Sequence, residues 1–375
     1  MPRLFHSMSA LPVFLALLLF SAAGLFAADA PKKAPQKEIV WHDAAQWKPG
    51  GRAWDDTPSH YSRLPQRAEG KVTKSVWRLS RNSAGLVVYF RTNAPVIHTR
   101  HEVSGELAKP HMSATGVSGL DLYARAPNGQ WRWAGSSKPK NKIHEEKILN
   151  GATPEWRDYM LYLPLYNNTT SVEIGIPEGS GFEPVAPPPA KPIAYYGTSI
   201  AHGCSASRPG MTTPAILGRK LDMPVINLGF SGNGKMEPAM AELFAEIDAA
   251  VFVLDCLPNM SALAPSEIIK RTENCIRAIR KKHPQTPIIL MEDRSYANAW
   301  IIPRQFKKNE TARAAVRSVY DSLTAEGVKG ITYVTGGQLL GDDDEGTVDS
   351  SHPSDLGMYR QAEILLPVLK RTLGK

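Results

Sequence analysis

The chain has 375 residues, of which 42% are hydrophobic and 21% charged, with a formal net charge of +8. This length exceeds the roughly 250–300 residues at which a single hydrophobic core stops growing, so two cores are expected, and the composition excludes a fibrous or disordered chain. The lysines and arginines are scattered along the chain rather than clustered, which argues against a nucleic-acid binder. The positive charge is expected to serve solubility, with attraction to an acidic polysaccharide or envelope surface as the alternative.

The N-terminus has the pattern of a targeting segment. Arg3 precedes an apolar run over residues 11–26, and small residues follow at Ala28 and Ala30. Residues 1–30 are therefore predicted to be a signal peptide, and the protein is expected to be secreted or periplasmic. The run is shorter than the about 20 apolar residues of a spanning helix, and its retention as a membrane anchor is the alternative. No membrane span is expected after cleavage.

Short strand-like runs separated by turn residues fill residues 38–178. The runs lack helical periodicity and comprise residues 86–91, 96–100, 120–124, 131–133, 159–163 and 172–176. Many short strands of this kind predict an all-β domain, a sandwich or jelly roll. Trp131, Trp133 and Trp156 either belong to the core of this domain or stack on sugar rings.

A second domain is predicted over residues 192–375, after a Pro- and Gly-rich linker at 179–191. Nearly continuous apolar runs at 193–196, 225–227, 251–254, 288–290 and 331–334 have the character of strands buried on both faces of a parallel sheet. Helical periodicity lies between these runs, around Met240, Ile276 and Val316, and a last helix is expected at about 355–373. The fold class is therefore α/β, three layers with a parallel sheet, preceded by the all-β domain.

Candidate catalytic residues follow these strands, where open α/β sheets bind their ligands. Ser199 comes after the first strand within a glycine-flanked turn, and a glycine-rich segment at 227–234 comes after the second. Asn259 follows the third strand. Asp349 stands three residues before His352 in the loop ahead of the last helix, a spacing that lets the carboxylate orient the ring through Nδ1. Each segment by itself is also compatible with an ordinary turn or helix cap.

The four segments together fill the roles of a serine hydrolase. A serine hydroxyl needs a base to take its proton, the base needs an orienting carboxylate, and the developing oxyanion needs hydrogen-bond donors. Glycines let backbone amides approach a ligand closely, and the amide of Asn259 can donate to the same oxygen. This chemistry requires no metal or cofactor.

These segments resemble the conserved blocks of the SGNH, or GDSL-type, hydrolases over residues 191–375. The resemblance implies a flavodoxin-like α/β/α fold with Ser199 as nucleophile, His352 as general base and Asp349 as its orienting partner. It also implies an oxyanion hole formed by the N–H groups of Ser199 and Gly232 and the side chain of Asn259. Gly119 to Tyr123 resembles the Gly-x-Asp-Leu-Tyr motif of a β-domain that precedes some SGNH esterases, often carbohydrate esterases.

The chain departs from the family pattern at two places. Thr198 stands where many relatives have aspartate, a position outside the triad. The segment of Asn259 lacks the usual Gly-x-Asn-Asp form, so Asn233 is the substitute oxyanion donor.

Three further residues are candidates for contact with substrate. His202 lies one turn after the serine, with local structure as the alternative. Arg208 could bind a sugar hydroxyl or carboxylate, and Glu292 follows the fourth strand, where an internal ion pair is the alternative. Among the cysteines, a Cys204–Cys256 bridge is conceivable in an oxidising compartment.

The predicted function is hydrolysis of short acyl esters, chiefly acetyl, on a carbohydrate. The alternatives are a lipolytic esterase or thioesterase that uses the same triad, and a non-catalytic glycan-binding envelope protein.

Overall fold

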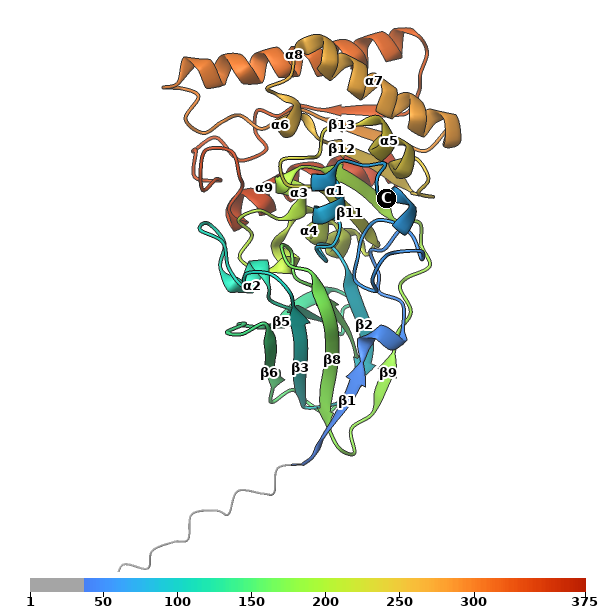
Figure 1. The fold of residues 1–375 in the computed structure, drawn as a ribbon, viewed down its shortest axis with the longest axis vertical. Helices are drawn as coiled ribbons and strands as arrows, with labels where there is room; N and C mark the ends of the chain where they lie inside the picture. Colours follow the sequence, from blue (N-terminus) through green and yellow to red (C-terminus); the bar gives the residue numbers. More distant parts are fainter. Residues whose placement is uncertain (1–36) are drawn as a thin grey trace, which may run out of the picture. The chain divides into compact units, whose positions relative to one another are not determined.

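The structure is a computed structural model that describes residues 37–375. The predicted signal peptide, residues 1–30, lies outside the described residues. From Glu38 to Lys375 the chain forms one compact unit, which Figure 1 colours from blue to red. No helix within residues 37–375 has the length and apolarity that crossing a membrane would require.

Two antiparallel sheets pack against each other in the first half of this unit, so the predicted β-sandwich is confirmed (Figure 1). One sheet has the order β1-β8-β3-β6, made of β1 (Ile39–Asp43), β8 (Thr169–Pro177), β3 (Val96–Val103) and β6 (Ile143–Asn150). The other has the order β5-β4-β7-β2-β9, made of β5 (Trp131–Ser136), β4 (Asp121–Arg125), β7 (Arg157–Tyr162), β2 (Val87–Thr92) and β9 (Phe182–Pro184). Side chains from both sheets, such as Val88, Leu161 and Ile174, share one buried core.

Strand β9 lies inside the stretch predicted to be a linker. It pairs antiparallel with β2, and the ring of Phe182 stacks 5.6 Å from that of Phe90. Pro184 is tolerated there because β9 is the edge strand of its sheet and needs no donor on its outer side. The first residues of the predicted linker therefore belong to the sandwich.

Five parallel strands form the sheet of the second half, in the order β11-β10-β12-β13-β14. They are β11 (Val225–Gly229), β10 (Ile193–Gly197), β12 (Val251–Asp255), β13 (Ile288–Met291) and β14 (Ile331–Val334). One face is covered by α5 (Pro238–Phe244), α6 (Leu257–Met260), α7 (Pro265–Lys282) and α8 (Pro303–Ala325), and the other by α3 (Ser199–His202), α4 (Thr213–Leu221) and α9 (Asp355–Leu373). Tyr195 points into one helical layer and Tyr196 into the other, so both faces of the strand are buried. The predicted three-layer α/β/α fold is confirmed.

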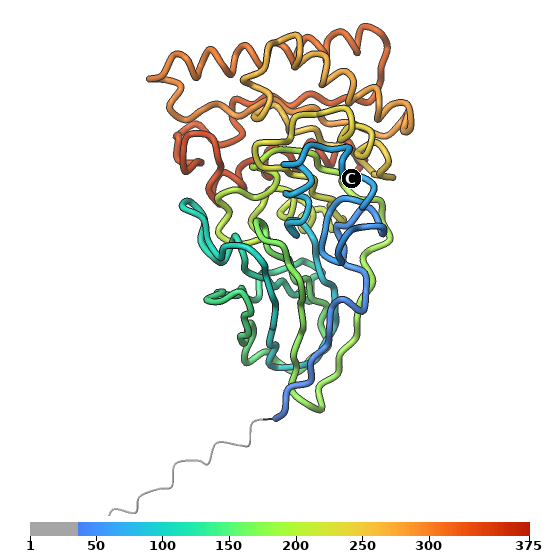
Figure 2. Tube along the Cα trace, in the orientation of Figure 1, coloured from blue at the N-terminus to red at the C-terminus, as the bar shows by residue number. Residues whose placement is uncertain are grey.

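The segment between β1 and β2 contributes to both cores, although the sequence places it within the all-β region: Ala44 and Tyr61 lie in the sandwich core. It contains α1 (Lys74–Leu79), and its apolar side chains Leu64 and Val76 are buried with Phe230 and Phe244 of the α/β half. Figure 2 shows this blue segment running from the sandwich to the α/β half. The two halves therefore share a hydrophobic core and are not joined by a linker alone.

A buried arginine fixes the same segment. The guanidinium of Arg63, 1% exposed, donates to the carbonyl oxygens of Asn227 and Gly229 at the end of β11, at 3.1 and 2.9 Å. It also donates to the carbonyls of Leu79 and Asn82, both at 2.8 Å. Two of these four bonds join the segment between β1 and β2 to the backbone of β11, and the other two lie within the segment.

Candidate active site

Ser199 is the first residue of α3, immediately after β10. The turn is too tight for a side chain at Gly197, because a Cβ there would lie 2.7 Å from the Cβ of Ala201. Thr198 caps the helix by accepting a hydrogen bond from the N–H of Ile200 at 3.2 Å. Gly203, with φ of 108°, ends the single helical turn. This short strand–turn–helix holds the Ser199 hydroxyl at the carboxyl edge of the sheet, where the sequence predicts a ligand site.

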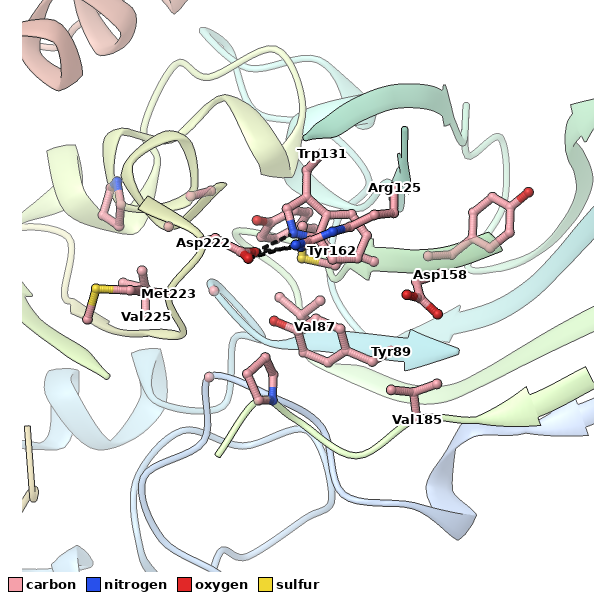
Figure 3. Close-up of a pocket in the computed structure, with 18 of the residues that line it drawn as sticks. Val87, Tyr89, Arg125, Trp131, Asp158, Tyr162, Val185, Asp222, Met223 and Val225 are labelled. Atoms are coloured by element: carbon pink, nitrogen blue, oxygen red, sulfur yellow. Dashed lines mark hydrogen bonds and ion pairs between the residues drawn. The ribbon is translucent and has the colours of Figure 1, made fainter. Parts of the chain in front are cut away.

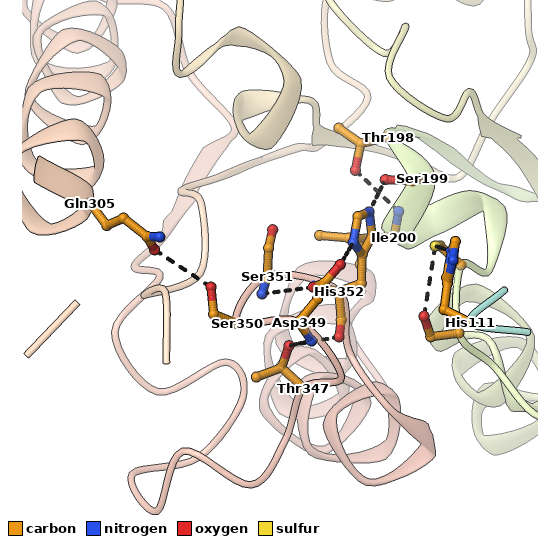
Figure 4. Close-up of polar contacts among 12 residues, drawn as sticks. His111, Thr198, Ser199, Ile200, Gln305, Thr347, Asp349, Ser350, Ser351 and His352 are labelled. Atoms are coloured by element: carbon orange, nitrogen blue, oxygen red, sulfur yellow. Dashed lines mark hydrogen bonds and ion pairs between the residues drawn. The ribbon is translucent and has the colours of Figure 1, made fainter. Parts of the chain in front are cut away.

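His352 and Asp349 complete a hydrogen-bonded chain with this serine, as Figure 4 shows. The Nε2 of His352 lies 2.8 Å from the Oγ of Ser199, and its Nδ1 lies 2.7 Å from the Oδ2 of Asp349. The serine and histidine are 153 residues apart in the sequence. The structure thus brings together the three side chains that the sequence assigns to a triad.

The Asp-x-x-His segment forms a compact turn, and this turn determines the orientation of the His352 ring. The Oδ1 of Asp349 accepts hydrogen bonds from the N–H groups of His352, at 2.7 Å, and Ser351, at 3.1 Å. The hydroxyl of Thr347 donates to the carbonyl oxygen of His352 at 2.8 Å. One carboxylate therefore binds both the backbone and the ring of the histidine, and the orientation of the ring follows from a local turn.

The pKa values of Asp349 and His352 are shifted in opposite directions. Burial acts to raise the pKa of Asp349, but the hydrogen bonds from the backbone and ring of His352 outweigh it, so the pKa lies below the ordinary 3.8. The sulfur of Cys204 is the largest influence on His352, and with Asp349 it raises the pKa of the imidazole to about 9 against the opposing effect of burial. The carboxylate is therefore ionised at neutral pH, and the imidazole is a strong base.

The predicted oxyanion donors lie in the neighbouring loops. Ser199 is the first residue of its helix, so its N–H has no intrahelical acceptor. Gly232 has φ of 70°, and open space lies where its Cβ would be. The Oδ1 of Asn259 accepts from the N–H of Gly234 at 3.2 Å, which leaves its amide nitrogen as the free end of the side chain. The amide nitrogen of Asn233, by contrast, donates to the carbonyl of Ser231 at 2.8 Å. Asn259 is therefore the better placed of the two asparagines.

The three candidate substrate contacts are engaged inside the protein. His202 as a substrate contact is a correction, since its side chain is 0% exposed, its Nε2 lies 2.7 Å from the carbonyl of Leu165, and its ring stacks 4.1 Å from that of Tyr166. Glu292 accepts from the hydroxyl of Tyr333 and the N–H of Gly336, both at 2.7 Å. Its carboxylate also lies 3.5 Å from the Nε of Arg313, which is the internal ion pair of the alternative interpretation.

Arg208 joins the two halves of the protein and does not project freely toward a substrate. Its Nη1 donates to the Oδ2 of Asp121 at 2.7 Å and to the hydroxyl of Tyr123 at 2.6 Å. The N–H of Gly210 reaches the same Oδ2 at 2.8 Å. The Gly-x-Asp-Leu-Tyr segment therefore binds the loop that follows the nucleophile helix.

Sequence reasoning missed two residues beside the triad. The Nε2 of His111, in the loop before β4, lies 3.1 Å from the Sγ of Cys204. The ring of His111 lies 6.3 Å from that of His352. All three cysteines of the chain are free, so the Cys204–Cys256 bridge is wrong. No local motif surrounds His111, and its position is a consequence of how the sandwich sits on the α/β half.

A separate cavity of about 290 Å³ lies between the sandwich and α4 (Figure 3). It is lined by aromatic residues such as Tyr89 and Trp131 and contains none of the triad residues. Its most prominent charged groups are paired, because Arg125 binds Asp222 through two hydrogen bonds of 2.6 and 2.7 Å. The indole N–H of Trp131 donates to the same carboxylate at 3.0 Å. This cavity is part of the contact between the halves and carries no nucleophile.

Comparison with known proteins agrees with the geometry. The sequence model of the GDSL-like lipase/acylhydrolase family matches residues 190–370, and that of the GxDLY N-terminal domain of SGNH-hydrolase-type esterases matches residues 39–182. A crystal structure from Bacteroides ovatus, described as a GDSL-like lipase, is 35% identical, with a TM-score of 0.85 over 90% of this chain and 98% of that chain. The chain belongs to the SGNH, or GDSL-type, hydrolase family.

More distant solved structures share the fold of this SGNH hydrolase. The salicylyl-acyltransferase SsfX3 from a tetracycline biosynthetic pathway is 20% identical, with a TM-score of 0.70 over 91% of this chain and 98% of that chain. A family 2 carbohydrate esterase from Clostridium thermocellum, in complex with cellohexaose, is 16% identical, with a TM-score of 0.55 over 78% of this chain and 93% of that chain. No match was found among curated proteins. The family assignment makes this SGNH hydrolase an esterase or acylhydrolase.

Proposed function

We propose that this SGNH hydrolase is a carbohydrate esterase that removes short acyl groups, chiefly acetyl, with Ser199, His352 and Asp349 as its catalytic triad. The observation that carries the proposal is the hydrogen-bonded chain from the Oγ of Ser199 through His352 to Asp349, at 2.8 and 2.7 Å. A serine hydroxyl becomes nucleophilic when a base is in position to take its proton, and this arrangement supplies one.

The reaction proceeds through an acyl-enzyme. The Oγ of Ser199 attacks the ester carbonyl carbon while the Nε2 of His352 takes the hydroxyl proton, and Asp349 stabilises the imidazolium. The tetrahedral intermediate collapses when the carbon–oxygen bond to the sugar breaks, and His352 returns the proton to the departing sugar oxygen. Water then attacks the acyl-enzyme by the same route, which releases the acid and restores Ser199.

The oxyanion of the tetrahedral intermediate is assigned to three donors. These are the N–H groups of Ser199 and Gly232 and the amide nitrogen of Asn259. The hydrogen bond from Gly234 to the Oδ1 of Asn259 supports this assignment, because it fixes the amide with its nitrogen unused. Fixed donors of this kind stabilise charge that develops only in the transition state.

A carbohydrate substrate is supported by a patch of exposed side chains near the triad. The patch comprises Trp300, Ile301 and Phe306, which are 78%, 61% and 58% exposed. The segment that bears it is bonded to the triad loop, since the N–H of Ala297 donates to the carbonyl of Ser350 at 3.0 Å. We refer to these three residues as the Trp300 patch. Exposed apolar surface beside a reactive centre is typical of a ligand-binding face.

The fold neighbours add to this support. They include family 2 carbohydrate esterases from Clostridium thermocellum and Cellvibrio japonicus. Secretion or export to the periplasm, the expectation from residues 1–30, would give such an enzyme access to polysaccharide. N-terminal sequencing of the protein recovered from its host would test cleavage after that segment, and an intact N-terminus would favour the anchor.

The proposal is tested by acetate release from a panel of acetylated polysaccharides, with Ser199→Ala as the control. We expect release by the native protein and none by the variant. A fluorophosphonate probe should label Ser199 in the native protein only. Binding of glycans without labelling or release would instead identify a non-catalytic glycan-binding protein.

The second candidate is a lipolytic esterase on the same triad. The Trp300 patch favours it as well, since its apolar side chains could also contact an acyl chain. Comparing kcat/KM for acetyl and octanoyl esters of one alcohol separates the two functions. A clear preference for octanoyl would replace the carbohydrate esterase with the lipolytic enzyme.

A further inference from the structure

A second concave surface lies outside the catalytic edge, between the sandwich and the helices α4 and α9. It is a groove of about 520 Å³, and none of the triad residues lines it. Strand β5 contributes Trp131 and Trp133 to the lining, and α9 contributes Tyr359. Trp131 also lines the cavity of Figure 3. We refer to this surface as the Trp133 groove.

Two aromatic rings of the groove are open to solvent. Trp133 is 54% exposed on the sandwich, and Tyr359 is 44% exposed on α9. Large aromatic side chains that gather in one concave surface without being covered are typical of a binding site. Because the two rings come from different halves of the protein, this site exists only in the assembled fold.

The tryptophan rings are held in place by carboxylates of the protein. The indole N–H of Trp133 donates to the Oδ1 of Asp121 at 3.0 Å, and that of Trp131 donates to the Oδ1 of Asp222 at 3.0 Å. The guanidinium of Arg125 lies 4.9 Å from the centre of the Trp131 ring, and Figure 3 shows Trp131 beside Arg125 and Asp222. Rings that are fixed before a ligand arrives lose little conformational freedom on binding.

The charged side chains of the groove are cationic. Of the residues in 37–375 that line it, the charged ones are Arg208, Arg219 and Lys220. Arg208 and Lys220 are each paired with a carboxylate, at 2.7 and 2.8 Å. Arg219 binds a carbonyl instead: its Nη2 donates to that of Gly210 at 2.7 Å, and its Nη1 has no hydrogen-bond partner within the described chain. The groove therefore has an excess of positive charge, which favours an anionic ligand.

Helix α9 connects the groove with the catalytic edge. It begins at Asp355, in the chain segment directly after His352. Leu356 is 46% exposed and lies on the same face of the helix as Tyr359, one turn nearer to the triad loop. The loop between α3 and α4 is bonded to the same end of α9, because the N–H of Ser207 donates to the Oδ1 of Asp355 at 2.9 Å. A chain bound in the groove therefore contacts elements that also hold the triad.

We propose that the Trp133 groove is a second, non-catalytic binding site for a carbohydrate chain that carries carboxylates, such as an oligomer of uronic acids. The C–H faces of the sugar rings stack on Trp133 and Tyr359, whose ring faces are electron-rich, and the carboxylates pair with Arg219 and Lys220. A neutral chain would stack on the same rings but would leave the charge of Arg219 without a partner.

The inference rests on the proposed function, because it gives the polymer that bears the acyl groups a second point of attachment. Two attachment points on one polymer raise the effective concentration of its ester groups near Ser199. The sandwich then takes part in recognition of the substrate without contributing a residue to the triad.

Binding is measured by isothermal titration calorimetry with hexagalacturonate, an acidic probe without ester groups, and with cellohexaose as its neutral counterpart. We expect the native protein to bind hexagalacturonate, and to bind cellohexaose about tenfold more weakly, because the neutral chain makes no charge-assisted hydrogen bond. The affinity for hexagalacturonate should fall as the salt concentration is raised. Equal affinity for the two probes, or no binding of hexagalacturonate, would overturn the proposal.

Variants of the aromatic rings locate the bound probe. Trp133→Ala and Tyr359→Ala should each weaken the binding of hexagalacturonate about tenfold or more, as the loss of an aromatic anchor does. Trp133→Phe keeps a stacking face and loses the bond to Asp121, so it should retain most of the affinity. Trp156→Ala is the matched control, since Trp156 is 42% exposed on the same sandwich. Native affinity in both Trp133→Ala and Tyr359→Ala would place the probe elsewhere and refute the inference.

Variants of Arg219 test the charge of the groove. Arg219→Gln should lower the affinity for hexagalacturonate to that for cellohexaose, and Arg219→Lys, which keeps the charge, should retain most of it. Lys281→Gln, at the end of α7, is the matched control. An equal loss of affinity in Arg219→Gln and Arg219→Lys would contradict the pairing of a carboxylate with this residue.

The probe carries no ester, so this inference and the proposed function fail separately. Binding of hexagalacturonate in the groove of a protein that releases no acetate would refute the proposed function alone. Release of acetate by a protein whose groove variants bind the probe as tightly as the native protein would refute the inference alone.

Discussion

Asp121, in the Gly-x-Asp-Leu-Tyr motif, offers a direct test of how the sandwich is fastened to the α/β half. Its carboxylate is fully buried and accepts three hydrogen bonds, from the indole N–H of Trp133 at 3.0 Å, from Arg208 at 2.7 Å and from the N–H of Gly210 at 2.8 Å. In Asp121→Asn the single amide oxygen can face either Trp133 or the loop after the nucleophile helix, so at least one of the three donors meets the NH2 group. Both bonds to the loop are lost if the oxygen stays with Trp133, and the charge beside Arg208 is lost in either orientation.

The size of the loss can be worked from these contacts. Hydrogen bonds to charged groups contribute about 1.5–3 kcal/mol each, which sets an upper limit of about 6 kcal/mol for two. We expect a smaller loss than this limit, because the native carboxylate is itself destabilised by burial. Burial raises the pKa of Asp121 despite the nearby charge of Arg208. The side chain of Arg208 is also 22% exposed and can be partly rehydrated. We expect Asp121→Asn to lower the free energy of unfolding by about 2–3 kcal/mol.

Urea unfolding followed by tryptophan fluorescence measures this change. Asp158→Asn is the matched control, since that carboxylate lies on the same sandwich, is 51% exposed and is 3.5 Å from Arg91. Its effect should stay within about 0.5 kcal/mol. A double-mutant cycle with Arg208→Met should give a coupling above about 1 kcal/mol. Equal effects of the Asp121 and Asp158 variants, or no coupling with Arg208, would refute the account of the motif as a latch between the halves.

Three further predictions concern the catalytic edge. Asn259→Ala should cost about 2.7–4 kcal/mol of transition-state stabilisation in kcat, and Asn233→Ala much less; the reverse order would move the oxyanion donor to Asn233. Asp349→Asn should lower kcat by about 10⁴-fold with the fold intact, because the ring of His352 loses its ionised partner; a change under tenfold would show that another group orients the base. Trp300→Ala should lower kcat/KM on acetylated polysaccharide but not on p-nitrophenyl acetate; equal losses on both would place Trp300 in the acyl site and not on the polymer.

Local sequence patterns were sufficient to predict the helices and strands and the order in which the catalytic residues follow the strands. Apolar runs such as that around Val253 indicated strands covered on both faces, and the structure buries them there. The approach of Ser199 to His352 across 153 residues was predictable because the carboxyl ends of parallel strands share one edge of the sheet. Chemical complementarity, in which a nucleophile requires a base and the base a carboxylate, then selected the residues.

The contacts that side chains make through tertiary packing could not be predicted from the sequence in this way. The position of His202 after the serine suggested access to substrate, but the loop at Leu165 covers it and accepts its hydrogen bond. Strand β9 was hidden in a proline-rich stretch, since an edge strand tolerates the residues that mark a linker. The apolar residues of the segment after β1, such as Leu64, follow no regular helical or strand spacing. The sequence therefore does not show what they pack against.

The sequence by itself determined the two architectures, the position of the nucleophile turn and the identity of its base and carboxylate, because each depends on periodicity or on a short local motif. Only the tertiary structure decided that the halves share one core, that Asp121 and Arg208 latch them, and that His111 meets Cys204 across 93 residues. Contacts between surfaces depend on the shapes that both halves have after folding. Periodicity along the chain shows which side chains are buried, whereas the tertiary fold determines which residues bury them.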